Sequence, residues 1–289
     1  MAEDQFADRR KGGTYLFVRP RAQRRPKAPD WTRDAAQVDG MPPIVLPRVQ
    51  GEAEPDFAAA EVRREIRVRH VRPRMEPGQL DPRLHVLLQP EGAGAEAYRA
   101  LAGAVQRERR GAARLWVVGA RAGSGATLTC LNLGAAMSET QRVTLVEVAP
   151  QADFARRLGL PQPPVWDADA RAPLDLWLVG DHLAVLCTAA VDPTERADAR
   201  GDAPTRVLDA AATAADVVLL DGPSLDSAGA AERMRGLADA AVLVVCPLDL
   251  GTGAYERALA ALDGLRVVGV IVNGRPEALV DGFARGNAA

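Results

Sequence analysis

The sequence predicts an α/β protein whose core is a doubly wound, mostly parallel β-sheet. From residue 81 onward, short apolar runs alternate with segments that have helical periodicity. The apolar runs are nearly continuous stretches of Val, Leu and Ile, which is typical of parallel strands covered on both faces. Strands that alternate with helices are joined by right-handed crossovers, and these crossovers place helices on both faces of one sheet.

Each element follows from its local pattern. An alternation of apolar and charged residues at 65–71 predicts a lone edge strand, and the Pro- and Gly-containing stretch 161–181 predicts an irregular insertion. The apolar runs predict strands at 115–119, 143–148, 183–188, 217–221, 241–246 and 267–272. The periodic segments predict helices at 94–110, 127–137, 204–215, 228–237 and 253–262.

Charge divides the chain into two parts. Residues 1–80 contain 16 Lys and Arg against 12 Asp and Glu, whereas residues 81–289 contain 20 against 26. The first part also has few large aliphatic residues in its first 60 positions, so we expect 1–80 to be a mostly disordered, basic tail and 81–289 to be the folded domain. The basic cluster 19–27 is either a solvated linker or a contact for anionic lipid or an acidic partner.

Several classes of protein are excluded by composition. The sequence has no run of about 18 apolar residues that would span a membrane. It shows no secretory leader, and Cys130, Cys187 and Cys246 lie far apart in apolar stretches without metal-ligand or disulfide spacing. We therefore expect a cytoplasmic protein with buried, unreactive thiols.

The most informative motif is a phosphate-binding loop without its lysine. Residues 119–127, Gly-Ala-Arg-Ala-Gly-Ser-Gly-Ala-Thr, follow one predicted strand and open the next predicted helix. This is the setting of the P-loop pattern G-x-x-x-x-G-K-S/T, which Gly125 and Thr127 fit. The first glycine of the pattern falls on Ala120, directly after Gly119. Ala126 stands where the pattern requires lysine, and the only lysines, Lys11 and Lys27, lie far upstream.

The loop predicts a site that binds ATP and magnesium, with complete loss of cofactor binding as the alternative. Backbone N–H groups of Gly123, Ser124 and Gly125 would surround the phosphates, and the Thr127 hydroxyl would bind Mg²⁺. Asp221 ends the apolar strand 217–221, at the sheet edge where ligands of open α/β folds bind, and would be the second magnesium ligand. The alternatives are a tight strand–helix turn and a turn formed by Asp-Gly-Pro.

Four further segments resemble a known family. Residues 142–149 resemble the second acidic strand of the deviant Walker ATPases, with Glu147 as its first acid and Ala149 in place of its second. Residues 96–102 resemble the Glu-x-x-Arg-x-x-Arg helix of bacterial tyrosine kinases, with matches at Glu96 and Arg99. The runs 238–247 and 267–274 resemble the closing strands of the same family.

Residues 90–275 therefore resemble a bacterial tyrosine kinase domain of the capsule and exopolysaccharide type, within the P-loop superfamily of ParA and MinD. The resemblance implies catalytic roles for Glu147 and Asp221 and an assembly interface at Glu96 and Arg99. It also implies a partner in the cytoplasmic segment of a membrane-anchored chain-length or export protein, homo-oligomerisation, peripheral location at the inner membrane, and no nucleic acid. The implied nucleotide-binding positions are Arg121, which aligns with the superfamily's signature lysine, Gly123, Ser124, Gly125, Ala126, Thr127 and the adenine-binding Asn273.

Departures from the family pattern predict lost chemistry. The family phosphorylates a C-terminal tyrosine cluster, but the tyrosines here are Tyr15, Tyr98 and Tyr255. Loss of one electrostatic donor such as the loop lysine costs about 3–4 kcal/mol, or about 10²–10³ in rate. We therefore predict a degenerate regulatory or scaffold subunit of exopolysaccharide synthesis and export. The alternatives are an active, atypical ATPase or tyrosine kinase that uses Arg121, and a ParA/MinD-type positioning ATPase.

Overall fold

The computed structural model describes seven stretches of the chain. These are residues 16–18, 68–73, 77–148, 153–161, 174–186, 203–250 and 252–274. All of them belong to one of the two compact units of the chain, which comprises Met1–Pro20 and Ile66–Ala289. The second unit, Arg21–Glu65, lies outside the described residues.

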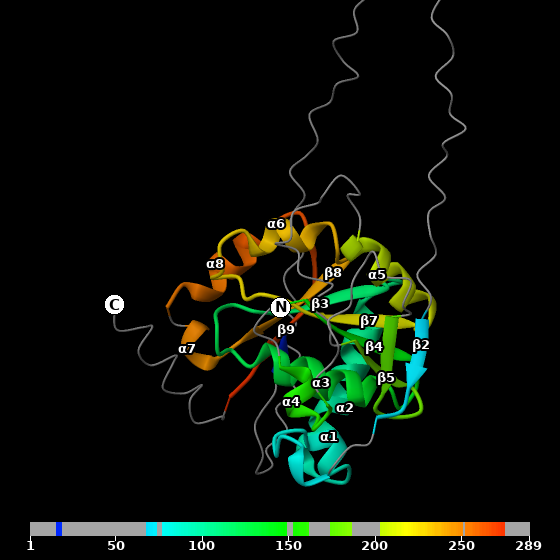
Figure 1. Cartoon of the computed structure of the whole chain (residues 1–289). Coiled ribbons are helices and arrows are strands. Elements are labelled where there is room, and N and C mark those ends of the chain that lie inside the picture. Colours follow the sequence, from blue (N-terminus) through cyan, green and yellow to red (C-terminus); the bar gives the residue numbers. More distant parts are fainter. Residues whose placement is uncertain are drawn as a thin grey trace, which may run out of the picture. The chain divides into compact units, whose positions relative to one another are not determined.

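The described strands form one sheet in the order β1-β9-β8-β3-β7-β4-β6-β5-β2 (Figure 1). The six strands from β9 to β6 in this order run parallel to one another, so the prediction of a mostly parallel sheet is confirmed. The strands are β1 (Leu16–Val18), β2 (Val68–Val71), β3 (Arg114–Gly119), β4 (Val143–Glu147), β5 (Leu174–Leu178), β6 (Leu183–Leu186), β7 (Val217–Asp221), β8 (Ala240–Val245) and β9 (Arg266–Val272).

Helices cover both faces of the sheet, as a doubly wound fold requires. Figure 1 shows α2 and α3 on one side of the strands and α5, α6 and α8 on the other. The helices are η1 (Pro77–Gln79), α1 (His85–Leu88), α2 (Ala93–Glu108), α3 (Ala126–Met137), α4 (Phe154–Arg157), α5 (Ala203–Thr213), α6 (Ala230–Arg235), α7 (Pro247–Leu250) and α8 (Ala254–Ala261).

The two faces of the sheet have separate hydrophobic cores. Leu115 and Val117 of β3 point into the first core, which contains Leu101 of α2 and Leu131 of α3. Trp116 of β3 points into the second core, with side chains from α5, α6 and α8. Five of the six residues of β3 are buried, because both faces and both edges of this strand are covered. This burial on both faces explains why the run 115–119 is continuously apolar.

The structure changes the sequence-based description at the edges of the sheet. The prediction of an irregular insertion at 161–181 is wrong at 174–178, where β5 pairs antiparallel with β6 and parallel with β2. β2 lies at one end of the sheet, as an edge strand would, and Arg69 forms a bidentate ion pair with Asp175 across the β2–β5 pair. At the other end, β1 pairs antiparallel with β9, where no strand is expected from the sequence.

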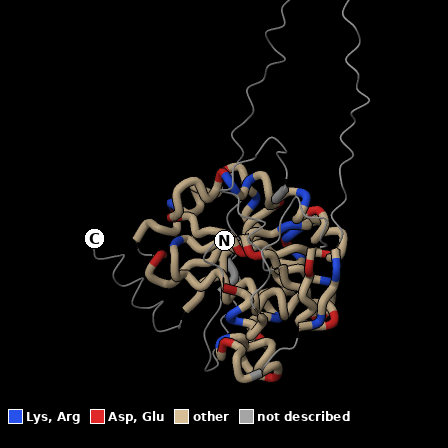
Figure 2. Tube along the Cα trace, viewed as in Figure 1, with Lys and Arg blue, Asp and Glu red and all other residues tan. Residues whose placement is uncertain are grey.

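The division into a tail, 1–80, and a domain, 81–289, remains a prediction. Two strands from the first segment, β1 and β2, belong to the sheet, whereas most of residues 1–67 lie outside the described part of the chain. The charges of the described residues are mixed in sign along the chain trace (Figure 2). Ion pairs such as Arg142–Asp216, at 2.9 Å, join the two signs at the surface.

Close packing of α3 on the sheet generates a stability prediction. An added Cβ at Gly134 of α3 would lie 2.4 Å from Cδ2 of the buried Leu145 on β4. We expect Gly134→Ala to lower the free energy of unfolding by about 1–3 kcal/mol, because the core must move to admit the methyl group. At Gly103 of α2, the nearest atom to an added Cβ is Nη1 at the flexible end of the Arg107 side chain, 3.4 Å away.

Gly103→Ala is therefore a matched control for the same substitution within a helix. It should raise the free energy of unfolding by about 0.5–1 kcal/mol through helix propensity alone. Urea denaturation of both variants measures the two effects. Equal effects of the two substitutions would contradict the packing argument.

Candidate functional site

The loop between β3 and α3 has the backbone of a phosphate-binding loop. β3 ends at Gly119, and α3 begins at Ala126. Gly123 and Gly125 adopt φ angles of 82° and 88°, in the left-handed region that favours glycine. The glycines of this motif are thus required by the backbone conformation, and the predicted strand–loop–helix arrangement is present.

Internal hydrogen bonds hold the loop in this conformation. The side chain of Ser124 is buried, and its hydroxyl donates to the carbonyl of Arg121 at 2.8 Å and accepts from the Arg121 N–H at 3.2 Å. Asn273, which follows β9, donates from Nδ2 to the carbonyl of Ser124 at 2.9 Å. An added Cβ at Gly125 would lie 2.0 Å from the same Nδ2 atom. Asn273 therefore supports the loop itself, and its role in adenine binding remains a prediction.

The start of α3 provides hydrogen-bond donors for an anion. Within the described residues, the N–H groups of Gly123, Gly125, Ala126 and Thr127 donate to no other protein group. α3 has 12 residues, and the N-terminus of such a helix favours negative charge. These groups fit the phosphates of a nucleotide. Ala126 places a methyl group at the first helical position, where the motif requires an ammonium group.

Arg121 is already bound to a carboxylate. Its Nε donates to Oδ1 of Asp249 at 2.6 Å, and its Nη2 donates to Sγ of Cys246 at 3.0 Å. The Asp249 side chain is only 2% exposed, and its second oxygen accepts from the Cys246 N–H at 2.7 Å. The hydrogen bond with Asp249 raises the pKa of Arg121 above its ordinary value. The guanidinium that is closest in sequence to the phosphate-binding amides is thus held in an ion pair.

Two buried acids lie side by side next to the loop. Glu147 of β4 and Asp221 of β7 are direct neighbours in the parallel register. Burial raises the pKa of Asp221 to about 7; a hydrogen bond from the Thr127 hydroxyl opposes this shift, and the charge of Glu147 adds to it. Burial also raises the pKa of Glu147 to about 7, although the carboxylate accepts the N–H of Phe154 at 2.9 Å. The structure thus brings Thr127, Asp221 and Glu147 together, as the sequence predicts.

These residues fit a magnesium ion that is shared with phosphates. Oδ2 of Asp221 is buried and has no hydrogen-bond partner, and the Thr127 hydroxyl contacts the same carboxylate. No cluster of three or more His, Cys, Asp or Glu side chains that could hold a metal is present in the described stretches. A Mg²⁺ ion at Thr127 and Asp221 would therefore take its other ligands from water and phosphate oxygens, as Mg²⁺ commonly does.

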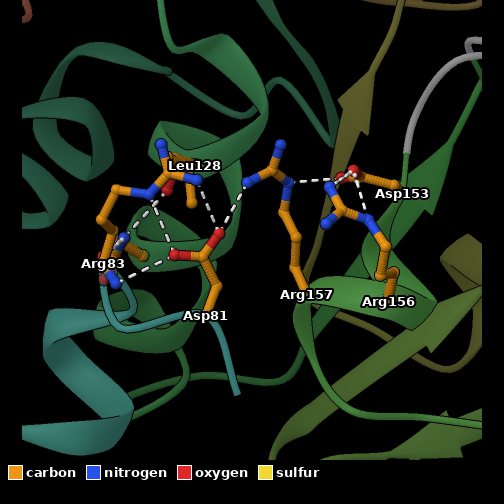
Figure 3. A network of polar contacts seen from close by, with 7 residues as sticks. Asp81, Arg83, Leu128, Asp153, Arg156 and Arg157 are labelled. Carbon is orange, nitrogen blue, oxygen red and sulfur yellow. Dashed lines mark hydrogen bonds and ion pairs between the residues drawn. The ribbon is translucent and has the colours of Figure 1, made fainter. Parts of the chain in front are cut away.

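A network of charged residues joins α4 to the segment before α1 (Figure 3). Asp153 forms ion pairs with Arg156 and Arg157, and Arg157 also donates to Asp81 at 2.7 Å. Asp81 in turn accepts two hydrogen bonds from the side chain of Arg83, at 2.9 and 2.8 Å. The charge of Asp153 raises the pKa of Glu147 and Asp221, and that of Arg157 lowers the pKa of Asp221. Ala149, which stands in place of the second acid of the family's strand, lies outside the described residues.

The predicted interface residues differ in their surroundings. Arg99 of α2 donates to both oxygens of Glu139, at 2.9 and 2.8 Å, and to the carbonyl of Pro90 at 2.7 Å. Glu96 is exposed in the first turn of the same helix. Arg99 therefore contributes to contacts within the fold, and an assembly role for the pair remains a prediction that rests mainly on Glu96.

Two aspartates at the loop are not found by the sequence analysis. Asp249, which binds Arg121, lies in α7, a short helix that the sequence does not predict. Asp226 follows β7 and accepts the N–H of Ala122 through both carboxylate oxygens, at 3.2 and 3.1 Å. Both aspartates lie in the segments that follow the strands flanking β3, and this placement at the carboxyl end of the sheet is the signal that would have identified them.

The fold and the loop define a P-loop type α/β protein, and solved structures of the same fold are tyrosine kinase domains. The BceF tyrosine kinase domain superimposes with a TM-score of 0.53 at 21% identity, covering 67% of this chain and 82% of that one. The VpsO kinase domain gives a TM-score of 0.53 at 18% identity, covering 62% and 93%. The chimerical protein CapA2B2 gives a TM-score of 0.52 at 16% identity, covering 66% of this chain and 90% of that one.

These similarities confirm the predicted resemblance to bacterial tyrosine kinase domains at the level of the fold. At 16–21% identity they do not extend to activity. No profile of a known protein family and no curated protein sequence matches the chain.

The raised pKa of Glu147 generates a prediction of pH dependence. The pKa is about 7 in the folded protein and has its ordinary value, 4.5, in the unfolded chain. Between these two values the unfolded chain releases the proton first, so the free energy of unfolding falls as the pH rises, and the loss is complete above about 7. Glu147→Gln keeps an oxygen that accepts the Phe154 N–H, and it removes the fall in the free energy of unfolding that Glu147 causes as the pH rises.

We expect Glu147→Gln to be more stable than the wild type at pH 8, by up to about 3 kcal/mol, and equally stable near pH 4. Urea denaturation at the two pH values measures the difference. Gly103→Ala, which changes no titratable group, should show the same dependence on pH as the wild type. A stability gain for Glu147→Gln that is the same at both pH values would disprove the proton linkage.

Proposed function

We propose that this chain is a tyrosine-kinase-like P-loop protein with degenerate phosphoryl-transfer chemistry, acting as a regulatory or scaffold subunit in exopolysaccharide synthesis and export. One observation carries the proposal: the phosphate-binding loop has no lysine at Ala126, and its own arginine, Arg121, is held by Asp249. The resemblance to exopolysaccharide kinases and the shared fold with the BceF and VpsO kinase domains support the cellular context.

The residues of the site account for binding better than for catalysis. The free N–H groups from Gly123 to Thr127 would hold phosphates, and Thr127 with Asp221 would hold Mg²⁺, which neutralises charge on the phosphates when it is bound. Phosphoryl transfer also requires a cation close to the transferred group, because negative charge spreads over its oxygens. The methyl group of Ala126 provides none.

Rescue of activity by Arg121 has a structural cost. The guanidinium would have to leave Asp249, whose side chain is 2% exposed and would then be a buried carboxylate without its ion-pair partner. Breaking one side of a buried pair is strongly unfavourable. The geometry therefore favours a degenerate protein over an atypical ATPase or kinase that uses Arg121.

The proposed partner is the cytoplasmic segment of a membrane-anchored chain-length or export protein. None of the helices in the described residues is long and apolar enough to span a bilayer. The resemblance to exopolysaccharide kinases supports a location in the cytoplasm, at the inner membrane through this partner. Glu96, exposed on α2, is the proposed contact residue for self-association.

Restoring the lysine tests the functional proposal. In the full chain, wild-type protein should hydrolyse ATP no faster than a blank. Ala126→Lys should raise the affinity for a fluorescent ATP analogue about 10–150-fold, because a charge-assisted hydrogen bond contributes about 1.5–3 kcal/mol. It should not produce phosphotyrosine, since Ala149 still stands in place of the second acid of the 142–149 segment.

Magnesium-dependent turnover near one per second in the wild type, abolished by Asp221→Ala, would refute the proposed loss of catalysis. Unchanged affinity in Ala126→Lys would show instead that the loop is not shaped for phosphate.

Charge reversal at Glu96 tests the proposed assembly. Glu96→Arg should weaken self-association at least about tenfold in sedimentation experiments, a loss of about 1.4 kcal/mol. Glu256→Arg is the matched control, because Glu256 is also an exposed glutamate in the first turn of a helix, α8. Both variants lose the same favourable interaction with a helix N-terminus. Equal sedimentation of both variants and the wild type would argue against an interface at Glu96.

A further inference from the structure

The segment that follows β7 lies directly on the phosphate-binding loop. The N–H of Leu225 donates to the carbonyl of Gly119 at 3.0 Å, where β3 ends. One residue further on, the carboxylate of Asp226 accepts the N–H of Ala122 through both oxygens, at 3.2 and 3.1 Å. The carboxylate of Asp226 thus binds a backbone donor of the loop in the manner of an external anion.

Asp226 is fixed in this position as an anion. The hydroxyl of Ser224 donates to its Oδ1 at 2.5 Å, and this hydrogen bond lowers the pKa of Asp226, as does the one from Ala122. The positive charge of Arg121 lowers the pKa as well. The side chain is exposed, so no buried contact prevents it from moving away from the loop.

We propose that Asp226 is an internal ligand of the loop, which occupies its Ala122 N–H and weakens the binding of phosphate-bearing ligands. The free N–H groups begin at the next residue, Gly123. A phosphate bound there would lie beside the negative charge of Asp226, and like charges at such separations repel. The loop's own cation, Arg121, is already paired with Asp249 and also lies near Asp226, so its one positive charge is opposed by two carboxylates before any phosphate binds.

This inference rests on the proposed function only in taking the loop as an anion-binding site. It adds a second reason for weak nucleotide binding, independent of the missing lysine at Ala126. It also makes binding adjustable, because displacement of the segment 224–226 from the loop would free the Ala122 N–H and remove the negative charge at the same time.

The chain contains a matched carboxylate at the opposite end of β3. Oδ2 of Asp239 accepts the N–H groups of Ala113 and Arg114, at 2.9 and 2.8 Å, just before and at the start of the strand. Asp239 thus makes the same kind of contact with backbone donors as Asp226, but at the amino end of the strand, away from the loop.

Asp226→Asn and Asp239→Asn in the full chain test the proposal. An asparagine keeps one oxygen for the backbone N–H, replaces the other with an NH2 group and removes the charge, and the Leu225–Gly119 hydrogen bond still holds the segment. Calorimetric titration with magnesium pyrophosphate should show affinity about tenfold higher for Asp226→Asn than for the wild type, which corresponds to about 1.4 kcal/mol. Asp239→Asn should stay within about twofold of the wild type.

Three results would overturn the proposal. These are equal or weaker binding by Asp226→Asn, an equal gain in both variants, and no binding by any of the three proteins at the highest concentration reached. Urea denaturation of both variants shows whether each is folded in the titration buffer. The assay for ATP hydrolysis is separate: turnover by the wild type would refute the proposed function and leave the role of Asp226 to the titration.

Discussion

The site depends on the position of β3 in the interior of the sheet, between β7 and β8. Because the neighbouring strands run parallel to β3, their carboxyl ends meet at the same edge, and each delivers a polar residue to the loop that follows Gly119. Asp226 comes from the connection after β7, Asp249 from α7 after β8, and Asn273 from the end of β9. A strand at the edge of the sheet has one neighbouring strand only, so residues from both sides of the loop could not meet there.

Much of this arrangement follows from the sequence alone. The strand before the loop, the helix after it and the meeting of Thr127 with Asp221 are all predicted, because a buried parallel strand has a continuous apolar pattern and its end has a fixed place in the fold. Predicted helix limits differ from those of α2, α3, α5, α6 and α8 by only a few residues.

The remainder depends on contacts between distant residues. The helices α1, α4 and α7 have four residues each, too few for a periodic pattern, and β5 acquires its conformation by pairing with β2 and β6. The partner of Arg121 is 128 residues away in the sequence, and a charged side chain on a loop does not specify which acid it will meet. For the same reason, the contact of Asn273 with the loop backbone follows only from the three-dimensional structure.

The close approach of Asn273 to Gly125 has a consequence for the evolution of such loops. A side chain at position 125 would displace the amide group of Asn273, and the φ angle of 88° is unfavourable for any other residue. The glycine is therefore required by packing whether or not a nucleotide is ever bound, whereas a lysine at the neighbouring position serves the ligand alone. When catalysis is no longer under selection, the lysine is free to drift and the glycine is not. A glycine-rich loop by itself therefore identifies a fold and not an activity.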